Sequence, residues 1–309
     1  MPRAVPIVVA LLALQAALVL LFVVPSRSPE PHGLPVGVVG PASALPVRGD
    51  AFDVHSYSSA GGARTAIRER EVYGAVVPAE GRVLVASAAS AVVAQQLTAL
   101  APAGAKAEDV VPLASGDRRG ATLNLLFLPL MIACFPLAIL LGRLRLPRGR
   151  TLGLVLAFSA LSGLALTALL GAMDALPGPY LAVSAIVALI VAAVGLTAAG
   201  LVRAAGPAGL GIAALLFVVL GNPGSGNASA PELLPGFWRV TGQLMPPGAG
   251  GQALRDVAYF DGHALLVPAL VLAAWALFGA ALILLGRSAP KPPAAAPQVP
   301  ADSRIAVPA

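Results

Sequence analysis

The residue types that most often carry chemistry are few and scattered in this chain. Its three histidines, His32, His55 and His263, are too scattered along the sequence to suggest a metal site, and its one cysteine, Cys134, lies inside an apolar run. The sequence contains no G-x-x-x-x-G-K-[ST] loop for phosphates, no G-x-S-x-G and no HExxH motif. We therefore expect no catalytic residue, no metal, no cofactor and no enzymatic activity.

Aromatic, basic and amide side chains gather in one stretch, residues 222–262, which is too polar to span a membrane and too apolar for a free loop. Prolines punctuate it, and we predict two short helices, near 231–244 and 249–260, lying at a membrane–water interface, where Trp and Tyr are enriched. We call residues 222–262 the outer hairpin. Its candidates for a functional contact are Trp238, Arg239, Gln243, Arg255 and Tyr259.

The elements around these residues are apolar. The chain is 58% hydrophobic and 11% charged, against roughly 25% charged residues in soluble domains. Six runs without Asp, Glu, Lys or Arg stand out, at 4–24, 121–142, 151–172, 181–202, 207–222 and 263–286. All but the fifth have the ~20 residues that a membrane-spanning helix needs. We predict an α-helical polytopic membrane protein with about six transmembrane helices, residues 1–24 being an uncleaved anchor.

The basic residues predict how these helices are oriented. With a cytoplasmic N-terminus, the inner segments carry nine basic residues against one acid, and the outer loops 173–180 and 222–262 carry two basic residues against four acids. This is the asymmetry of the positive-inside rule. We expect a multi-pass protein of the cell membrane with both termini cytoplasmic. The net charge of +6 is thereby a topology signal, and we expect no nucleic-acid partner.

Residues 25–120 have a different character, because charge returns and short strand-like runs alternate with helical patterns. We predict strands at 36–40, 52–57, 72–77 and 82–86, helices at 60–71 and 88–100, and a last extended piece at 109–113. This order predicts a small extracytoplasmic α/β domain between the first and second membrane helices. Residues 121–286 would form a five-helix transmembrane domain, and 287–309, rich in Pro and Ala, a disordered cytoplasmic tail.

The spans contain no Asp, Glu, Lys or Arg, whereas ion-driven carriers normally keep ionisable groups inside the helix bundle. Energy for any transport would therefore come from elsewhere.

The order of elements resembles the ABC-2-type transporter permease class, closest to the branch that includes phage-infection-protein-like membrane proteins. The stretches that carry the resemblance are LPVGVVG at 34–40, ARTAIREREVYGAVVP at 63–78, GNPGSG at 221–226, and the hairpin pieces LLPGFW at 233–238, QLMPPGA at 243–249, LR at 254–255 and YFDG at 259–262. The resemblance implies a dimeric, channel-forming subunit, homo- or heterodimeric, that works with a separate cytoplasmic ATPase to export a lipid, glycan, peptide or drug.

The resemblance makes the inner loop GRLRLPRGR, at 142–150, the candidate contact for that ATPase, through Arg143, Arg145, Arg148 and Arg150. The shortness of this loop motivates an alternative. In it, the protein transports nothing, the helices are an anchor, and the external domain binds a partner, an envelope polymer or a phage.

Overall fold

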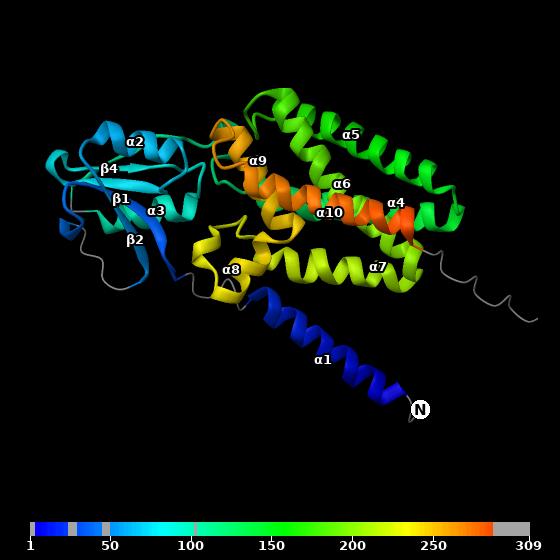
Figure 1. Cartoon of the computed structure of the whole chain (residues 1–309). Coiled ribbons are helices and arrows are strands. Elements are labelled where there is room, and N and C mark those ends of the chain that lie inside the picture. The colour runs from blue at the N-terminus through cyan, green and yellow to red at the C-terminus, as the bar shows by residue number, and fades with distance from the viewer. Residues whose placement is uncertain (1–3, 24–29, 45–49, 102–103, 287–309) are drawn as a thin grey trace, which may run out of the picture.

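The computed structural model describes residues 4–23, 30–44, 50–101 and 104–286. Within them, a small sheet domain lies at one end of a long helical bundle (Figure 1). The tail that the sequence predicts at 287–309 lies outside the described residues, as do the first three residues of the anchor.

Four helices are long and apolar enough to cross a membrane. They are α4 (Thr122–Leu144), α5 (Arg148–Ala172), α6 (Tyr180–Ala205) and α10 (Leu266–Leu285). The predicted fifth run forms a helical stretch shorter than these four. In it, α7 (Pro207–Ala214) continues into a π-helical segment, Leu215–Gly221. The first run forms α1 (Ala4–Val23), which contacts that π-helical segment and diverges from the bundle toward its N-terminus (Figure 1).

Helix α6 is the centre of the bundle, where it packs against α4, α5, α7 and α10. Small residues allow these close approaches, as expected for helices in lipid. A Cβ added at Gly163 would lie 2.9 Å from the Ala188 side chain, and one added at Gly200 would lie 2.8 Å from the Gly279 carbonyl. Thr197 Oγ1 also donates a hydrogen bond to the Trp275 carbonyl, 3.0 Å away, which joins α6 to α10.

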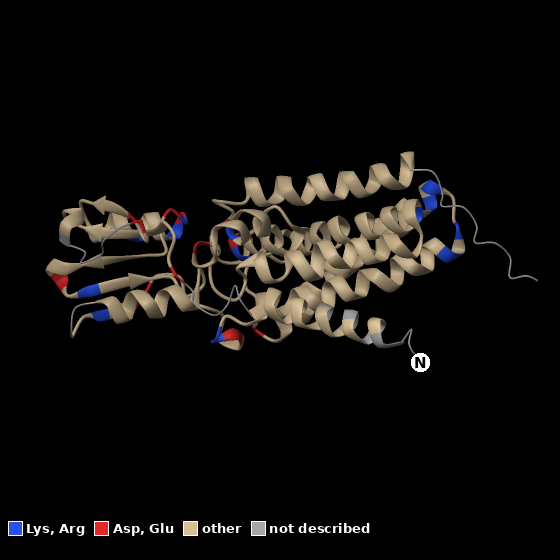
Figure 2. Cartoon of the chain, turned by 90° about the horizontal axis from the view of Figure 1, so that it is seen from below, with Lys and Arg blue, Asp and Glu red and all other residues tan. Residues whose placement is uncertain are grey.

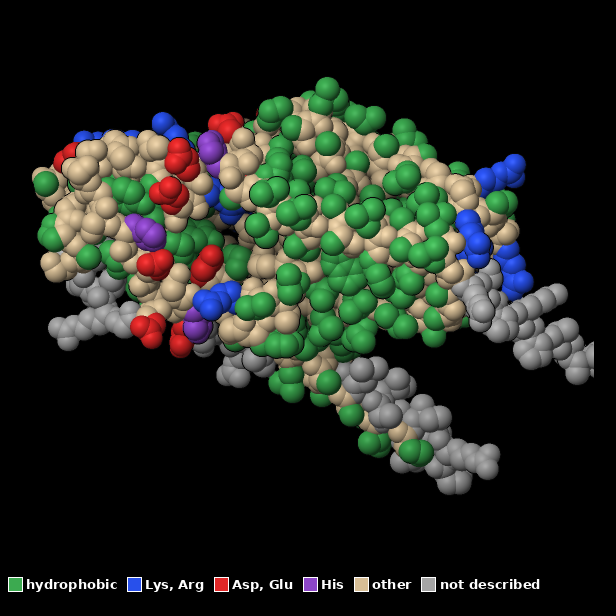
Figure 3. All heavy atoms as spheres, viewed as in Figure 1, with side chains coloured by type: hydrophobic (Ala, Val, Ile, Leu, Met, Phe, Trp, Pro, Cys, Tyr) green, Lys and Arg blue, Asp and Glu red, His purple; other side chains and the backbone are tan. Residues whose placement is uncertain are grey.

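The sides of the bundle are apolar and exposed. Leu125, Leu161, Leu181 and Leu277 are among the large hydrophobic side chains that point outward, and apolar side chains cover the visible flank of the helices (Figure 3). An exposed apolar surface of this extent has to be covered, and helices of this length fit a bilayer. Arginine side chains gather at the end of the bundle farthest from the sheet domain, where Figure 2 shows blue residues, and we call it the basic end.

The sheet domain contains five strands in the order β2-β1-β3-β4-β5. These are β1 (Leu34–Val39), β2 (Phe52–Tyr57), β3 (Gly74–Val77), β4 (Arg82–Val85) and β5 (Lys106–Asp109), with α2 (Ala60–Arg68) and α3 (Ala91–Leu100) between them. Strand β1 pairs in parallel with β2 and β3, β3 pairs antiparallel with β4, and β4 pairs in parallel with β5. The order of strands and helices is the one that the sequence predicts.

One strand differs from its prediction. The sequence predicts the last extended piece at 109–113, whereas β5 runs from Lys106 to Asp109. The apolar residues that suggested it, Val110 and Val111, follow the strand and pack against the core under α2. The strand itself has the polar sequence Lys-Ala-Glu-Asp because it lies at the sheet edge. There Glu108 accepts hydrogen bonds from Arg64 and Arg82.

The outer hairpin follows the π-helical segment and forms α8 (Gly236–Gln243) and α9 (Pro246–Tyr259) before α10 begins. The sequence places both helices at an interface, but α9 is buried along most of its length and packs against α6 and α10. Its first turn, Pro-Pro-Gly-Ala-Gly-Gly, lets the backbone approach the bundle closely. A Cβ at Gly250 would lie 2.8 Å from the ring of Phe127. Helix α9 is therefore part of the bundle, whereas α8 stays at the surface with Phe237 and Val240 exposed.

Candidate functional site

The hydrophobic core of the sheet domain is completed by the outer hairpin. On the α2 side of the sheet, the fully buried Phe260 packs among Ala63, Ile67 and Leu84. On the α3 side, Ala230 and Leu233 pack among Val36, Val93 and Leu97. Both faces of the sheet thus bury apolar side chains that come from residues 230–260, so the domain and the hairpin form one packed unit.

Arg70 makes the central polar contact between the two parts. It follows α2 in the left-handed conformation, with φ 63°, and the Glu71 amide donates to the Ala66 carbonyl while the Arg70 amide donates to the Ile67 carbonyl. This hydrogen-bond pattern is a Schellman motif, whose left-handed position glycine usually occupies. Here the arginine side chain uses the position to reach α9.

The Arg70 guanidinium contacts three side chains near the end of the hairpin. It donates to Gln252 Oε1 at 2.6 Å and to Asp256 Oδ1 at 3.4 Å, and its Cζ lies 5.2 Å from the centre of the Phe260 ring. We call Arg70, Gln252, Asp256 and Phe260 the latch. Charge-assisted hydrogen bonds and a cation–π contact combine in it, and both gain strength when water is excluded.

Asp256 is the most buried member of the latch, with 0% of its surface exposed. Its Oδ2 accepts a hydrogen bond from the Ala264 amide at 2.9 Å, which fixes the turn before α10. Burial raises the pKa of this carboxyl above its usual value, although the attraction of Arg70 opposes the shift. The two charges therefore depend on each other, because a buried charge is costly when no opposite charge lies beside it.

Two further hydrogen bonds reinforce this junction. Tyr73 Oη donates to Glu232 Oε2 at 2.7 Å, and burial raises the pKa of the tyrosine. Arg239 Nη1 donates to the His32 carbonyl at 2.7 Å, just before β1 begins. Together with the latch, these bonds hold the hairpin to the start of β1 and to the segment that leads into β3.

Arg255 is a buried arginine for which the described residues offer no carboxylate partner in an ion pair. Only 4% of its surface is exposed, and its Nη2 donates to the Asn227 carbonyl at 3.3 Å. Its Nε has no hydrogen-bond partner within the part of the chain that the structure describes. Burial, followed by repulsion from Arg70, lowers the pKa of Arg255 to about 10. Asn227, which with Ala228 and Ser229 matches the N-x-[ST] acceptor pattern for glycosylation, is itself buried and donates to the Pro247 carbonyl.

The remaining predicted hairpin residues support its internal structure. Gln243 Nε2 donates to the Ser225 carbonyl at 2.9 Å. The Trp238 ring stands edge-on to Phe237, with ring centres 5.4 Å apart, and leaves room for no side chain at Gly224. Tyr259 packs beside Phe260, between the cores of the bundle and the sheet domain.

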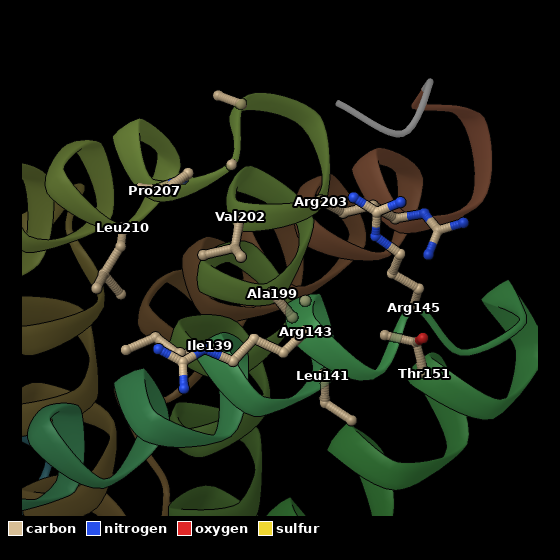
Figure 4. A pocket seen from close by; sticks show the side chains of 13 residues that line it. Ile139, Leu141, Arg143, Arg145, Thr151, Ala199, Val202, Arg203, Pro207 and Leu210 are labelled. Carbon is tan, nitrogen blue, oxygen red and sulfur yellow. The ribbon is translucent and has the colours of Figure 1, made fainter. Parts of the chain in front are cut away.

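The predicted inner arginines divide into two pairs. Arg143 and Arg145, at the end of α4, line a cavity of about 900 Å³ at the basic end, together with Arg203 at the end of α6 (Figure 4). Arg148 donates to the Gly286 carbonyl at 3.3 Å and joins α5 to the end of α10. Arg150 is exposed in the first turn of α5.

Sequence reasoning overlooked Arg70, Asp256 and Arg203 as candidates. Arg70 belongs to a charged helical run that usually only solvates a helix face, and Arg203 is an isolated basic residue after a span. A signal for Arg70 existed, since Glu69-Arg70-Glu71 directly follows Arg68, the last residue of α2. Its partner, 186 residues further on, has no local signal.

Comparisons with known proteins identify no relative. No protein-family model, no curated protein and no solved structure matches this chain.

Replacing Arg70 by glycine should separate the sheet domain from α9 without disturbing α2, because glycine favours the left-handed position. We expect amide hydrogen exchange to accelerate by roughly tenfold in residues 252–264, the loss expected of one charge-assisted contact. Arg68→Ala, which removes an exposed charge from the same helix, is the control. Equal exchange in the two variants would mean that the latch does not hold the domain.

Proposed function

We propose that this chain is the membrane subunit of an ABC-2-type exporter, which works with a separate ATPase to move a lipid, glycan, peptide or drug outward. In this proposal the chain crosses the cell membrane six times, both termini are cytoplasmic, the sheet domain is extracytoplasmic, and two subunits form the translocation path. The proposal combines the resemblance of the element order with the way in which the hairpin is built into the molecule.

The observation that carries the proposal is the position of α9 inside the bundle while its end completes the sheet domain core. Helices interrupted at membrane depth are tolerated where protein covers them, and transporters use them to line substrate paths. The break is extensive here, since a π-helical segment, several single turns and two short helices separate α7 from α10. A protein that served only as an anchor has no need of such a segment.

The six crossings require α1 and α7 to act as spans alongside α4, α5, α6 and α10. Helix α1 has 20 residues, the length a bilayer requires. The 8 residues of α7 and the 7 of the π-helical segment cover at most ~23 Å at ~1.5 Å per residue, against ~30 Å of hydrocarbon. The remaining length of this crossing would be supplied by the hairpin, which continues directly from the π-helical segment.

An external energy source follows from the composition of the spans. The chain has no Asp or Glu in residues 118–173 or 175–231, so an ion-coupled mechanism lacks its usual groups there. The connection between α4 and α5 is only Arg145 to Pro147. An ATPase would therefore contact exposed side chains at the basic end, for which Arg148 and Arg150 are the candidates outside the cavity.

Co-purification tests this proposal. The tagged full chain, extracted from its native cells in mild detergent, should retain an ATPase, and Arg148→Glu/Arg150→Glu should lower the recovered ATPase by roughly tenfold, as expected for the loss of close charge pairs. Arg118→Glu/Arg119→Glu, which reverses two charges near the sheet domain, is the matched control. If no ATPase co-purifies with the unaltered chain, the exporter proposal is wrong.

The alternative, an envelope protein whose external domain binds a partner independently of the helices, has less support. It requires a sheet domain that is complete by itself, whereas this one buries Phe260 and Leu233 from the hairpin in its two cores. Cutting the domain away would expose both apolar patches.

A further inference from the structure

The cavity at the basic end lies between the C-terminal ends of α4 and α6 and the start of α7. Its wall combines apolar side chains, including Ile139, Val202 and Leu210, with the three arginines Arg143, Arg145 and Arg203. Figure 4 shows the Arg145 and Arg203 side chains reaching toward the same side of the cavity, while the Arg143 side chain extends the other way, toward Leu210. The volume of about 900 Å³ is at the upper end of the range for ligand pockets, ~300–1,000 Å³.

The positive charge of this cavity has no acidic partner among the residues that line it. Arg203 Nη1 donates to the Leu146 carbonyl at 3.3 Å, but its Nε is buried without a partner among the described residues. The C-terminal ends of α4 and α6 each offset roughly half a charge. The start of α7, which also borders the cavity, adds roughly half a positive charge, so the cavity keeps a net positive charge, although Arg143 and Arg145 are also exposed to solvent.

Arg145 occupies its position against the preference of the backbone. It ends α4 in the left-handed conformation, with φ 48° and ψ 41°, where glycine or asparagine is usual. Glycine at this position would form the same helix end with less strain. Arginine at this position therefore supplies a side chain to the cavity at the cost of backbone strain.

We propose that this cavity binds an anionic phospholipid, with the phosphate between Arg145 and Arg203 and the acyl chains along Ile139, Val202 and Leu210. Guanidinium groups bind phosphate oxygens through paired hydrogen bonds, and basic pockets between membrane helices bind anionic headgroups. A free phosphate ion would satisfy the arginines but leave most of the cavity and its apolar wall uncovered. A lipid satisfies both parts.

Lipid retention by the purified full chain tests this site. The protein is delipidated in neutral detergent, incubated with phosphatidylglycerol, phosphatidylcholine or inorganic phosphate, and analysed by native mass spectrometry. We expect preferential retention of phosphatidylglycerol, and a loss of roughly tenfold in Arg145→Gly and in Arg203→Gln, the effect of one charge-assisted hydrogen bond. Arg150→Gln, which removes the same charge outside the cavity, should retain the lipid.

Three results would overturn the proposal: equal retention of the two lipids, equal losses in Arg150→Gln and Arg145→Gly, or displacement of phosphatidylglycerol by inorganic phosphate, which would identify a site for free anions. Because Arg145→Gly relieves backbone strain, a loss of lipid in that variant does not reflect misfolding. The measurement contains no ATPase, so its outcome is independent of the co-purification result.

Discussion

Replacing Asp256 by alanine lowers the free energy of unfolding by about 3–5 kcal/mol, the cost of leaving a buried charge without its partner. The substitution strands the Arg70 guanidinium against Phe260 and leaves the Ala264 amide without an acceptor. Thermal unfolding of the purified protein in detergent, followed by tryptophan fluorescence, measures the loss.

Two further variants separate the charge from the packing. Glu69→Ala, which removes an exposed acid next to Arg70, should leave the unfolding temperature unchanged. Replacing Arg70 and Asp256 together by methionine and leucine should recover most of the stability, because burial of both charges is itself costly. A double variant as unstable as Asp256→Ala would show that the ion pair is not the source of the effect.

The second large effect is expected at Gly242, the point where α8 touches the turn after the π-helical segment. A Cβ at this position would overlap the carbonyl group of Gly224, and a Cβ added at Gly248 would overlap the Gly242 carbonyl oxygen. Because the atoms that the Gly242 Cβ would overlap are backbone and not a flexible side chain, Gly242→Ala should cost about 3 kcal/mol or more, at the upper end for overpacking. We expect a severe loss of folded protein after detergent extraction, measured by size-exclusion chromatography.

Gly236→Ala is the matched control, since it changes the first residue of the same helix and a Cβ there meets nothing within 4 Å. The control should elute as the unaltered protein does. If Gly242→Ala also elutes unchanged, the hairpin is not packed as tightly as the close approach of the two backbones indicates.

Helix α9 links the bundle to the latch, so both large effects are expected to act on the same connection. Gly242 and Gly248 pack the hairpin onto itself, Gly250 brings it against Phe127 of the bundle, and Asp256 and Phe260 carry its other end into the sheet domain. In an exporter, a displacement of α9 would therefore move the sheet domain with it. An exporter of this kind therefore differs from a protein whose sheet domain is only tethered to its membrane helices.

Local patterns determined most of the elements. Runs without charge predicted the long helices, since apolar residues over ~20 positions have few other stable environments, and alternation predicted the order of strands and helices in the sheet domain. Arginines next to the ends of apolar runs predicted that Arg143, Arg145 and Arg148 would gather at one end of the bundle, and Figure 2 shows basic residues there.

Contacts between distant residues were decided only by the tertiary structure. The pairing of Arg70 with Asp256 joins residues that are 186 positions apart. The burial of α9 and the meeting of Arg145 with Arg203 bring together different helices. Polar residues with prolines and aromatics predict an interface helix from composition alone, but glycines with close backbone neighbours bury it instead. The sequence thus set which segments are apolar, whereas packing set which polar side chains face one another, because that depends on how the helices cross.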